Sequence, residues 1–260
     1  MARTIEREIF PKAPQSLVDA RERQAAITFR WIVDNEGHTI SRVRESLLDH
    51  TTGMQKIREY AMRRFPVFTG NIDMIASGET IEVHDDGEMI VGDLALSRKI
   101  SDKDKAHWKH RERAAFRLMT RDYLKDDAQL KQQARDAYQR YQVLDLNEPE
   151  DYKVGLFAHL VDKVQAARFG IINVFEHDSD EIDENGMSSL KNILKFTYPL
   201  LEVLPDETAK VELISFVTEE IKRYRKHGFP EITAFGLQAL HAYLETGQRI
   251  NDAETLDSVA

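Results

Sequence analysis

The stretch from His84 to Asp93 carries the residues of this sequence that are best suited to chemistry, and it reads His-Asp-Asp-Gly-Glu-Met-Ile-Val-Gly-Asp. Adjacent His84 and Asp85 can reach one divalent metal ion if the backbone leaves a helix at that point. Gly87 would supply the permissive backbone for the turn. The carboxylates of Glu88 and Asp93 would then lie near the ion, where they could handle protons for an activated water molecule. The pattern therefore predicts a metal-dependent site with two catalytic carboxylates.

Simpler explanations compete with chemistry for several of these polar residues. Glu88 and Asp93 also suit ordinary turns and caps, because Asp93 precedes Leu-Ala-Leu and could cap a helix there. We favour the catalytic interpretation, since the stretch is rich in His, Asp, Glu and Gly rather than in core-forming residues. His107 and His110 share one face of a predicted helix and could hold a second metal ion. No carboxylate stands at a suitable spacing from them, so we favour surface or partly buried positions.

The composition limits both the ligands and the partners. The 260 residues include no cysteine, which excludes disulfides and thiolate ligands and leaves histidine and carboxylate as the strong metal ligands. The formal net charge of -9 repels polyanions, so duplex nucleic acid is not an expected partner. The N-terminus lacks the apolar run of a secretory signal, and no stretch reaches the ~20 apolar residues of a membrane span. We therefore expect a cytoplasmic protein that acts on a small substrate and does not contact a membrane.

Apolar residues recur at helical spacing along the chain and almost no alternating β pattern is present, so we predict an all-α fold. A first helix is expected over about 17–33, and a second from just after Ser41 to about Arg64, before Pro66. An amphipathic helix is predicted over about 102–125. Another is predicted to begin at Pro149, with a buried face made of Val154, Phe157, Val161 and Val164.

The acidic, turn-rich segment 176–186 predicts a boundary between a core and a C-terminal extension. The expected organisation is an N-terminal segment over 1–25, a core over 26–178, a helical extension over 187–246 and a polar tail over 247–260. Within the extension, helices are predicted over 187–204, 207–227 and 230–246. Their apolar faces are too large to remain in water, so we expect the extension to pack on the core or on a second copy of the chain in a homodimer.

Between His84 and Asp93 the chain resembles the HD hydrolases, and within them the branch that contains the bacterial 5'-deoxynucleotidases. The pattern His-Asp-x-Gly-Glu-x-x-x-Gly-Asp is present here without a gap. Upstream, the Arg-Glu-Ser-Leu-Leu-Asp-His that ends at His50 is similar to the family's Glu-Ser-Val-Ala-Glu/Asp-His, whose histidine is the first metal ligand. Downstream, His-Leu-Val-Asp162-Lys163 is similar to the family's Asp-Lys segment, whose aspartate closes the coordination sphere.

This resemblance implies a ligand set and a substrate pocket. One divalent ion, from among Mn, Co, Mg, Zn and Fe, would be held by His50, His84, Asp85 and Asp162. In the nucleotidase branch an Arg-Trp pair on the first helix contributes to the substrate pocket, and Arg30 and Trp31 are the corresponding residues here. An arginine lying beside a buried tryptophan would explain that pair equally well.

Together these features predict hydrolysis of a phosphate ester in a small nucleotide, with 5'-(deoxy)nucleoside monophosphates as the first expected substrates. In this interpretation Glu88 orients or deprotonates the water, Asp93 delivers a proton to the leaving oxygen, and Arg30 neutralises the phosphate. Two alternatives remain open. The same metal site could release triphosphate from a deoxynucleoside triphosphate, or the chain could be a nucleotide-sensing or scaffold domain without catalysis.

Overall fold

The computed structural model describes residue 25 and residues 29–30, 45–92, 102–142, 149–173 and 181–250. Helices account for almost all of the regular structure in these ranges, and a single antiparallel pair of two-residue strands accompanies them. The predicted all-α class is therefore confirmed.

The described residues fall into two compact units. The first unit draws on residues 1–55 and 78–143, and the second on residues 56–77 and 144–260. Helices α3 (Leu47–Arg64) and α5 (Met74–Val83) each contribute residues to both units. The limits of these units differ from the predicted core over 26–178 and extension over 187–246. That predicted organisation stays a prediction.

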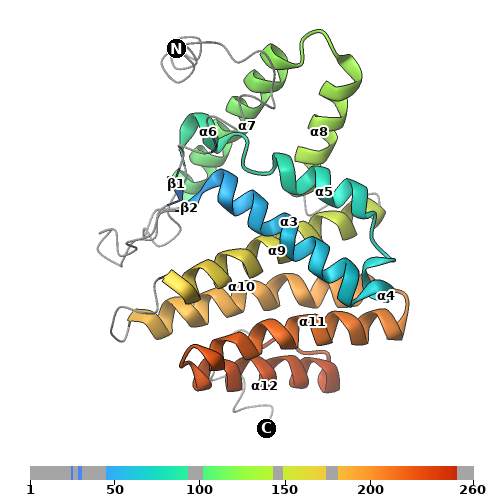
Figure 1. Cartoon of the computed structure of the whole chain (residues 1–260), viewed down its shortest axis with the longest axis vertical. Coiled ribbons are helices and arrows are strands. Elements are labelled where there is room, and N and C mark those ends of the chain that lie inside the picture. Colours follow the sequence, from blue (N-terminus) through green and yellow to red (C-terminus); the bar gives the residue numbers. More distant parts are fainter. Residues whose placement is uncertain are drawn as a thin grey trace. The chain divides into compact units, whose positions relative to one another are not determined.

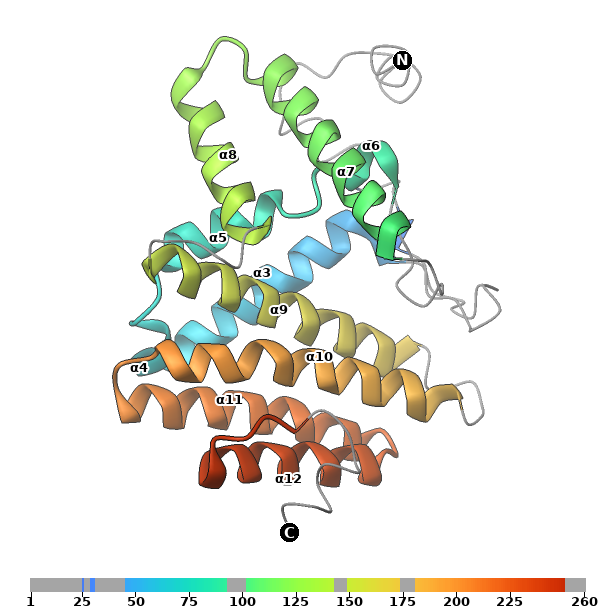
Figure 2. The same cartoon turned by 180° about the vertical axis from the view of Figure 1, so that it is seen from behind.

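In the first unit a short strand pair is followed by helices (Figure 1). Its other elements are β1 (Phe29–Arg30), β2 (Glu45–Ser46), α6 (Glu88–Val91), α7 (Asp102–Tyr123) and α8 (Ala128–Gln142). Helices α7 and α8 form a hairpin in both views (Figures 1 and 2). The rings of Phe116 and Tyr138 stack between them, with centroids 3.8 Å apart. This packing fixes α7 and α8 relative to each other.

The helix predicted over 102–125 is confirmed by α7, but α8 was not predicted. The buried side chains of α8 are Ala134, Ala137, Tyr138 and Tyr141, which repeat at helical spacing. That repeat was the available signal for the missed helix.

Strand β1 contradicts the helix predicted over 17–33 at Phe29 and Arg30, whereas Ala25, the other described position of that range, is helical. Phe29 pairs with Ser46, and Arg30 pairs with Glu45. The local sequence Ile-Thr-Phe-Arg-Trp-Ile-Val is rich in β-branched and aromatic residues, which favour an extended chain once a partner strand is present. The tertiary pairing therefore overrides the helical spacing on which the prediction rested.

Helix α3 begins at Leu47, several residues later than predicted, because Ser46 caps it. The backbone N–H of Asp49 donates to the Ser46 hydroxyl at 3.0 Å, and this hydroxyl donates to the Asp49 carboxylate at 2.7 Å. The first bond satisfies a backbone donor that would otherwise be unpaired in the first turn, and the second joins the two side chains. The spacing Ser-x-x-Asp marks the helix start in the sequence. The predicted end before Pro66 is confirmed at Arg64.

The second unit contains long helices that lie side by side. Helices α10, α11 and α12 are neighbours in both views, and α9 packs along α10 (Figures 1 and 2). Edge-to-face ring pairs join Phe68 to Phe157 and Phe65 to Phe216. The bounds are α4 (Pro66–Thr69), α9 (Pro149–Asn173), α10 (Glu181–Val203), α11 (Glu207–Lys226) and α12 (Pro230–Thr246).

Several sequence predictions hold in this unit. Helix α9 begins at Pro149, and its face of Val154, Phe157, Val161 and Val164 is fully buried. The predicted ends of the two last helices are confirmed within a residue by α11 and α12. The turn predicted to continue to residue 186 is wrong, because α10 already begins at Glu181. Acidic residues there favour a first helical turn, since they complement the positive end of the helix dipole.

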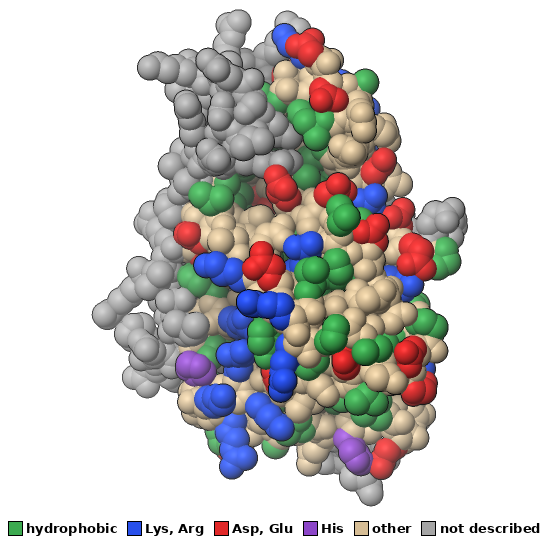
Figure 3. All heavy atoms as spheres, turned by 45° about the vertical axis from the view of Figure 1, so that its right-hand side comes forward, with side chains coloured by type: hydrophobic (Ala, Val, Ile, Leu, Met, Phe, Trp, Pro, Cys, Tyr) green, Lys and Arg blue, Asp and Glu red, His purple; other side chains and the backbone are tan. Residues whose placement is uncertain are grey.

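The described surface mixes apolar and charged side chains. On the face drawn in Figure 3, apolar side chains lie among lysine, arginine and acidic groups. In the parts of the chain that the structure describes, no helix combines the length and the apolarity that crossing a membrane requires.

Candidate metal centre

Two helices bring the central residues of the site together. His50 is the fourth residue of α3, in the part that belongs to the first unit, while His84 and Asp85 follow the end of α5 at Val83. There the backbone leaves the helix through a turn, in which the N–H of Asp86 donates to the Val83 carbonyl at 3.1 Å. The condition stated for His84 and Asp85 to reach one ion, that the backbone leaves the helix there, is therefore met.

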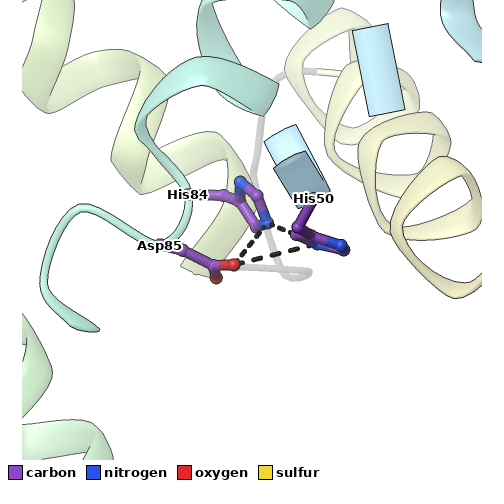
Figure 4. Close-up of side chains that lie close together, drawn as sticks. All are labelled: His50, His84 and Asp85. Atoms are coloured by element: carbon purple, nitrogen blue, oxygen red, sulfur yellow. Dashed lines mark hydrogen bonds and ion pairs between the residues drawn. The ribbon is translucent and has the colours of Figure 1, made fainter. Parts of the chain in front are cut away.

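The three side chains converge on one point (Figure 4). His84 Nε2 lies 2.9 Å from Asp85 Oδ2 and 3.4 Å from His50 Nε2, and His50 Nε2 lies 3.8 Å from Asp85 Oδ2. A point equidistant from these three atoms in their plane lies about 2.0 Å from each, close to the roughly 2.0–2.2 Å of bonds from zinc to nitrogen and oxygen. The arrangement fits a single divalent ion.

Each histidine has a group that faces its other ring nitrogen. His84 Nδ1 lies 2.7 Å from the carbonyl of Ile81, and since a carbonyl only accepts, Nδ1 carries the proton. With Nδ1 committed to this bond, Nε2 is the ring nitrogen of His84 that can offer a lone pair to a metal ion. Behind His50, Glu45 Oε2 lies 3.7 Å from Nδ1, and its carboxylate is buried. Groups at this position orient metal-binding histidines and raise their basicity.

Burial makes the cluster costly unless its charges and lone pairs are satisfied. The side chains of His50 and His84 are 0% and 1% exposed, and that of Asp85 is 15% exposed. With the proton of His84 on Nδ1, its Nε2 atom and the Asp85 carboxylate are both acceptors, so no hydrogen bond explains their separation of 2.9 Å. A shared cation explains all three distances and offsets the cost of burying a carboxylate. Asp85 provides the side of the cluster that solvent reaches.

Gly87 is required at the site for a different reason from the one predicted. Its φ of -63° is ordinary for any residue, so backbone freedom is not the cause. A Cβ atom on Gly87 would lie 2.4 Å from the carbonyl oxygen of Glu112 and 2.8 Å from its Cγ atom. Only glycine allows α7 to approach the turn this closely.

Glu88 occupies the first turn of α6 and is 9% exposed. Its backbone N–H donates to the carbonyl of Asp85 at 2.9 Å, so the same short turn carries both residues. A buried carboxylate at this position suits proton transfer better than the ordinary turn residue considered as an alternative. Its catalytic role stays a prediction.

A polar network lines the turn from the side of α7 and α8. Glu112, 1% exposed, accepts hydrogen bonds from Lys109 Nζ at 2.8 Å, the Tyr138 hydroxyl at 3.3 Å and the Gln142 amide at 3.4 Å. Burial acts to lower the pKa of Lys109, but the Glu112 charge and hydrogen bond, with Glu88 and Asp85 beyond it, raise that pKa above the usual lysine value. Lys109 therefore remains a cation at neutral pH.

Sequence reasoning missed this network and two further neighbours of the metal cluster. The ring of Tyr141 packs edge-on against His84, with centroids 4.9 Å apart, and Glu45 stands behind His50. Glu45 was quoted in the motif that ends at His50, but no role was assigned to it. The contribution of α7 and α8 had no local signal, because it depends on how these helices pack.

The other residues predicted from the sequence lie elsewhere or outside the described residues. Asp162 lies in α9 of the second unit, is buried, and accepts a bond from Lys163 at 2.7 Å; its assignment as a metal ligand stays a prediction. Trp31, Asp93 and the side chain of Arg30 lie outside the described residues. His107 and His110 are both exposed on α7, and among the described residues they belong to no group that could hold a metal ion.

Comparison with known proteins finds no relative of this chain. No protein-family model, no curated protein and no solved structure matches the chain.

Proposed function

We propose that this chain is a metal-dependent phosphohydrolase of the HD type that acts on small nucleotides, with 5'-(deoxy)nucleoside monophosphates as its first substrates. One observation carries the proposal: His50 converges with an adjacent His-Asp pair 34 residues later, at distances that suit a single ion. The sequence motif around His84 supplies the reaction type, and the geometry supports the metal.

The ligands are prepared for this task by their neighbours. When bound, a divalent ion supplies Lewis-acid activation of water and of a phosphate oxygen. His84 offers Nε2 because its Nδ1 proton is held by the Ile81 carbonyl, and Glu45 faces Nδ1 of His50. Asp85 supplies the anionic oxygen that a hard cation prefers.

Glu88 is proposed to hold and move the proton of the attacking water. It follows Asp85 by three residues in the same turn and lies in a protected position that strengthens electrostatic effects. The sequence adds Asp93 as the proposed donor to the leaving oxygen and Arg30 as a proposed phosphate contact. Each role concerns protons or charge, so none of the three should be needed to hold the ion.

A substrate screen tests the proposal. Purified protein is incubated with nucleoside mono- and triphosphates and with Mn, Co, Mg, Zn or Fe in turn, and the released anion is identified. We expect inorganic phosphate from monophosphates, and we expect Glu88→Gln to lose ~10² or more in turnover while retaining its metal. Asp104→Asn, at an exposed carboxylate of α7, is the matched control and should retain wild-type turnover.

The same screen separates the alternatives. Release of inorganic triphosphate from a nucleoside triphosphate would show that the activity is that of a triphosphohydrolase and not of a monophosphatase. Tight nucleotide binding without turnover for every metal would contradict catalysis and favour a sensing domain. Equal turnover by Glu88→Gln and wild type, with equal metal content, would remove Glu88 from the mechanism.

A further inference from the structure

The strongest unassigned feature is a cation held beside the metal centre. We propose that Lys109 binds the phosphate group of the substrate, and that Glu112 positions Lys109 for this task. The inference rests on the proposed function, because it names a further contact within that same site.

Glu112 links Lys109 to the turn that carries the site. The backbone of Glu112 packs directly against Gly87, which stands between Asp85 and Glu88 in the sequence. Lys109 lies about one helical turn before Glu112 on α7, and its Nζ atom donates to Glu112 Oε2 at 2.8 Å. The ammonium group is thus tied to a buried residue that is in contact with the turn.

The Lys109–Glu112 pair differs from an ordinary exposed pair on a helix. The Lys109 side chain is 52% exposed, whereas that of Glu112 is 1% exposed and is also held by Tyr138 and Gln142. The carboxylate is therefore fixed, and it keeps the ammonium group in one region while leaving part of it open to a ligand. Such preorganisation reduces the entropy lost when a ligand binds.

Charge supplies the reason for a lysine here. Asp85, Glu88 and Glu112 are all carboxylates, and a phosphate dianion approaching them would be repelled without positive charge nearby. A divalent ion offsets part of this repulsion, and Lys109 offsets more. Lysine ammonium groups are common phosphate contacts because they offer three donors and a compact charge.

Calorimetric binding of inorganic phosphate tests the inference, with and without Mn²⁺. We expect Lys109→Gln to weaken phosphate binding about tenfold or more, since a hydrogen bond to a charged group is lost. Lys109→Arg retains the charge and should weaken it less. Lys103→Gln, at an exposed lysine of the same helix, is the matched control and should bind phosphate like wild type.

A second pair of variants separates phosphate binding from a structural role. Lys109→Gln leaves the Glu112 charge buried without its cation, so the variant should melt at a lower temperature. The double variant Lys109→Gln, Glu112→Gln removes both charges and should recover that melting temperature. We expect its phosphate affinity to stay low, because the cation is still absent.

Mn²⁺ affinity, measured separately by calorimetry, distinguishes failure of this inference from failure of the proposed function. Absence of Mn²⁺ binding to wild type would contradict the proposed function, while weaker phosphate binding by Lys109→Gln without Mn²⁺ would still support the inference. Phosphate affinity equal to wild type in Lys109→Gln under both conditions would overturn the inference. So would recovery of phosphate affinity in the double variant, or no phosphate binding by wild type.

Discussion

Glu220 in the second unit and Glu112 in the first are both helical carboxylates with almost no exposure, but their charges are balanced differently. Arg168 binds Glu220 through two nitrogens, at 2.8 and 2.6 Å, and Arg223 adds a third contact at 2.9 Å. Glu112 instead receives a half-exposed lysine and two neutral donors. Glu220 is balanced by two guanidinium groups that are 26% and 40% exposed, whereas Glu112 is balanced by a single ammonium group that is 52% exposed and can take another partner.

The same contrast extends to the two units. The second unit buries long apolar helix faces, and its buried charged residues lie at well-separated positions of α9 and α11. In the first unit several of them gather at the turn after α5 and at the start of α3. The buried ionisable residues of the first unit include Glu45, His50, His84, Asp86, Glu88 and Glu112, and those of the second include Lys153, Asp162 and Glu220. Concentrated burial of this kind is costly for stability and is typical of a functional site.

The largest expected stability effect lies in the second unit. Arg168→Ala leaves Glu220 buried with only Arg223, and we expect a loss of about 3 kcal/mol in the free energy of unfolding, measured with urea. Arg249→Ala removes a comparable pair with Glu202, in which both side chains are about half exposed, and should cost at most about 1 kcal/mol. Similar losses in both variants would contradict the structural role given to Glu220.

A smaller effect is expected from adding one methyl group at each of two glycines. Gly87→Ala forces a clash with the backbone of Glu112 and should cost about 1–3 kcal/mol, with weaker Mn²⁺ binding because the turn holds Asp85. Gly170→Ala, in α9 of the second unit, meets no atom within 4 Å and should stabilise by about 0.5–1 kcal/mol. If Gly87→Ala left both the free energy of unfolding and the Mn²⁺ affinity unchanged, α7 would not need to approach the turn this closely.

The sequence was sufficient to predict the parts of this molecule that depend on local patterns. Pro149 and Pro230 mark helix starts, because a missing N–H costs nothing in a first turn. The convergence of His50 with His84 and Asp85 was predicted from motif order, and the structure confirms that these three residues meet.

What the sequence did not predict depends on packing between distant segments. The pairing of Phe29 with Ser46 turns a region of helical spacing into a strand, and no local pattern specifies the partner. The close approach of Glu112 to Gly87 joins α7 to the metal centre, so Lys109 acquires its neighbours only in the folded chain. The cap at Ser46 was different, because Ser-x-x-Asp was readable and would have placed the start of α3 correctly.

Metal content tests the central claim most directly. Wild type, His84→Ala, Asp85→Ala and His107→Ala are loaded with Mn²⁺, freed of excess ion and subjected to elemental analysis, with circular dichroism to confirm their fold. We expect about one ion per chain in wild type and in His107→Ala, whose histidine is exposed, and almost none in the other two, because each removes a ligand from a single site. Full metal content in folded His84→Ala and Asp85→Ala would contradict the assignment of this cluster as a metal centre.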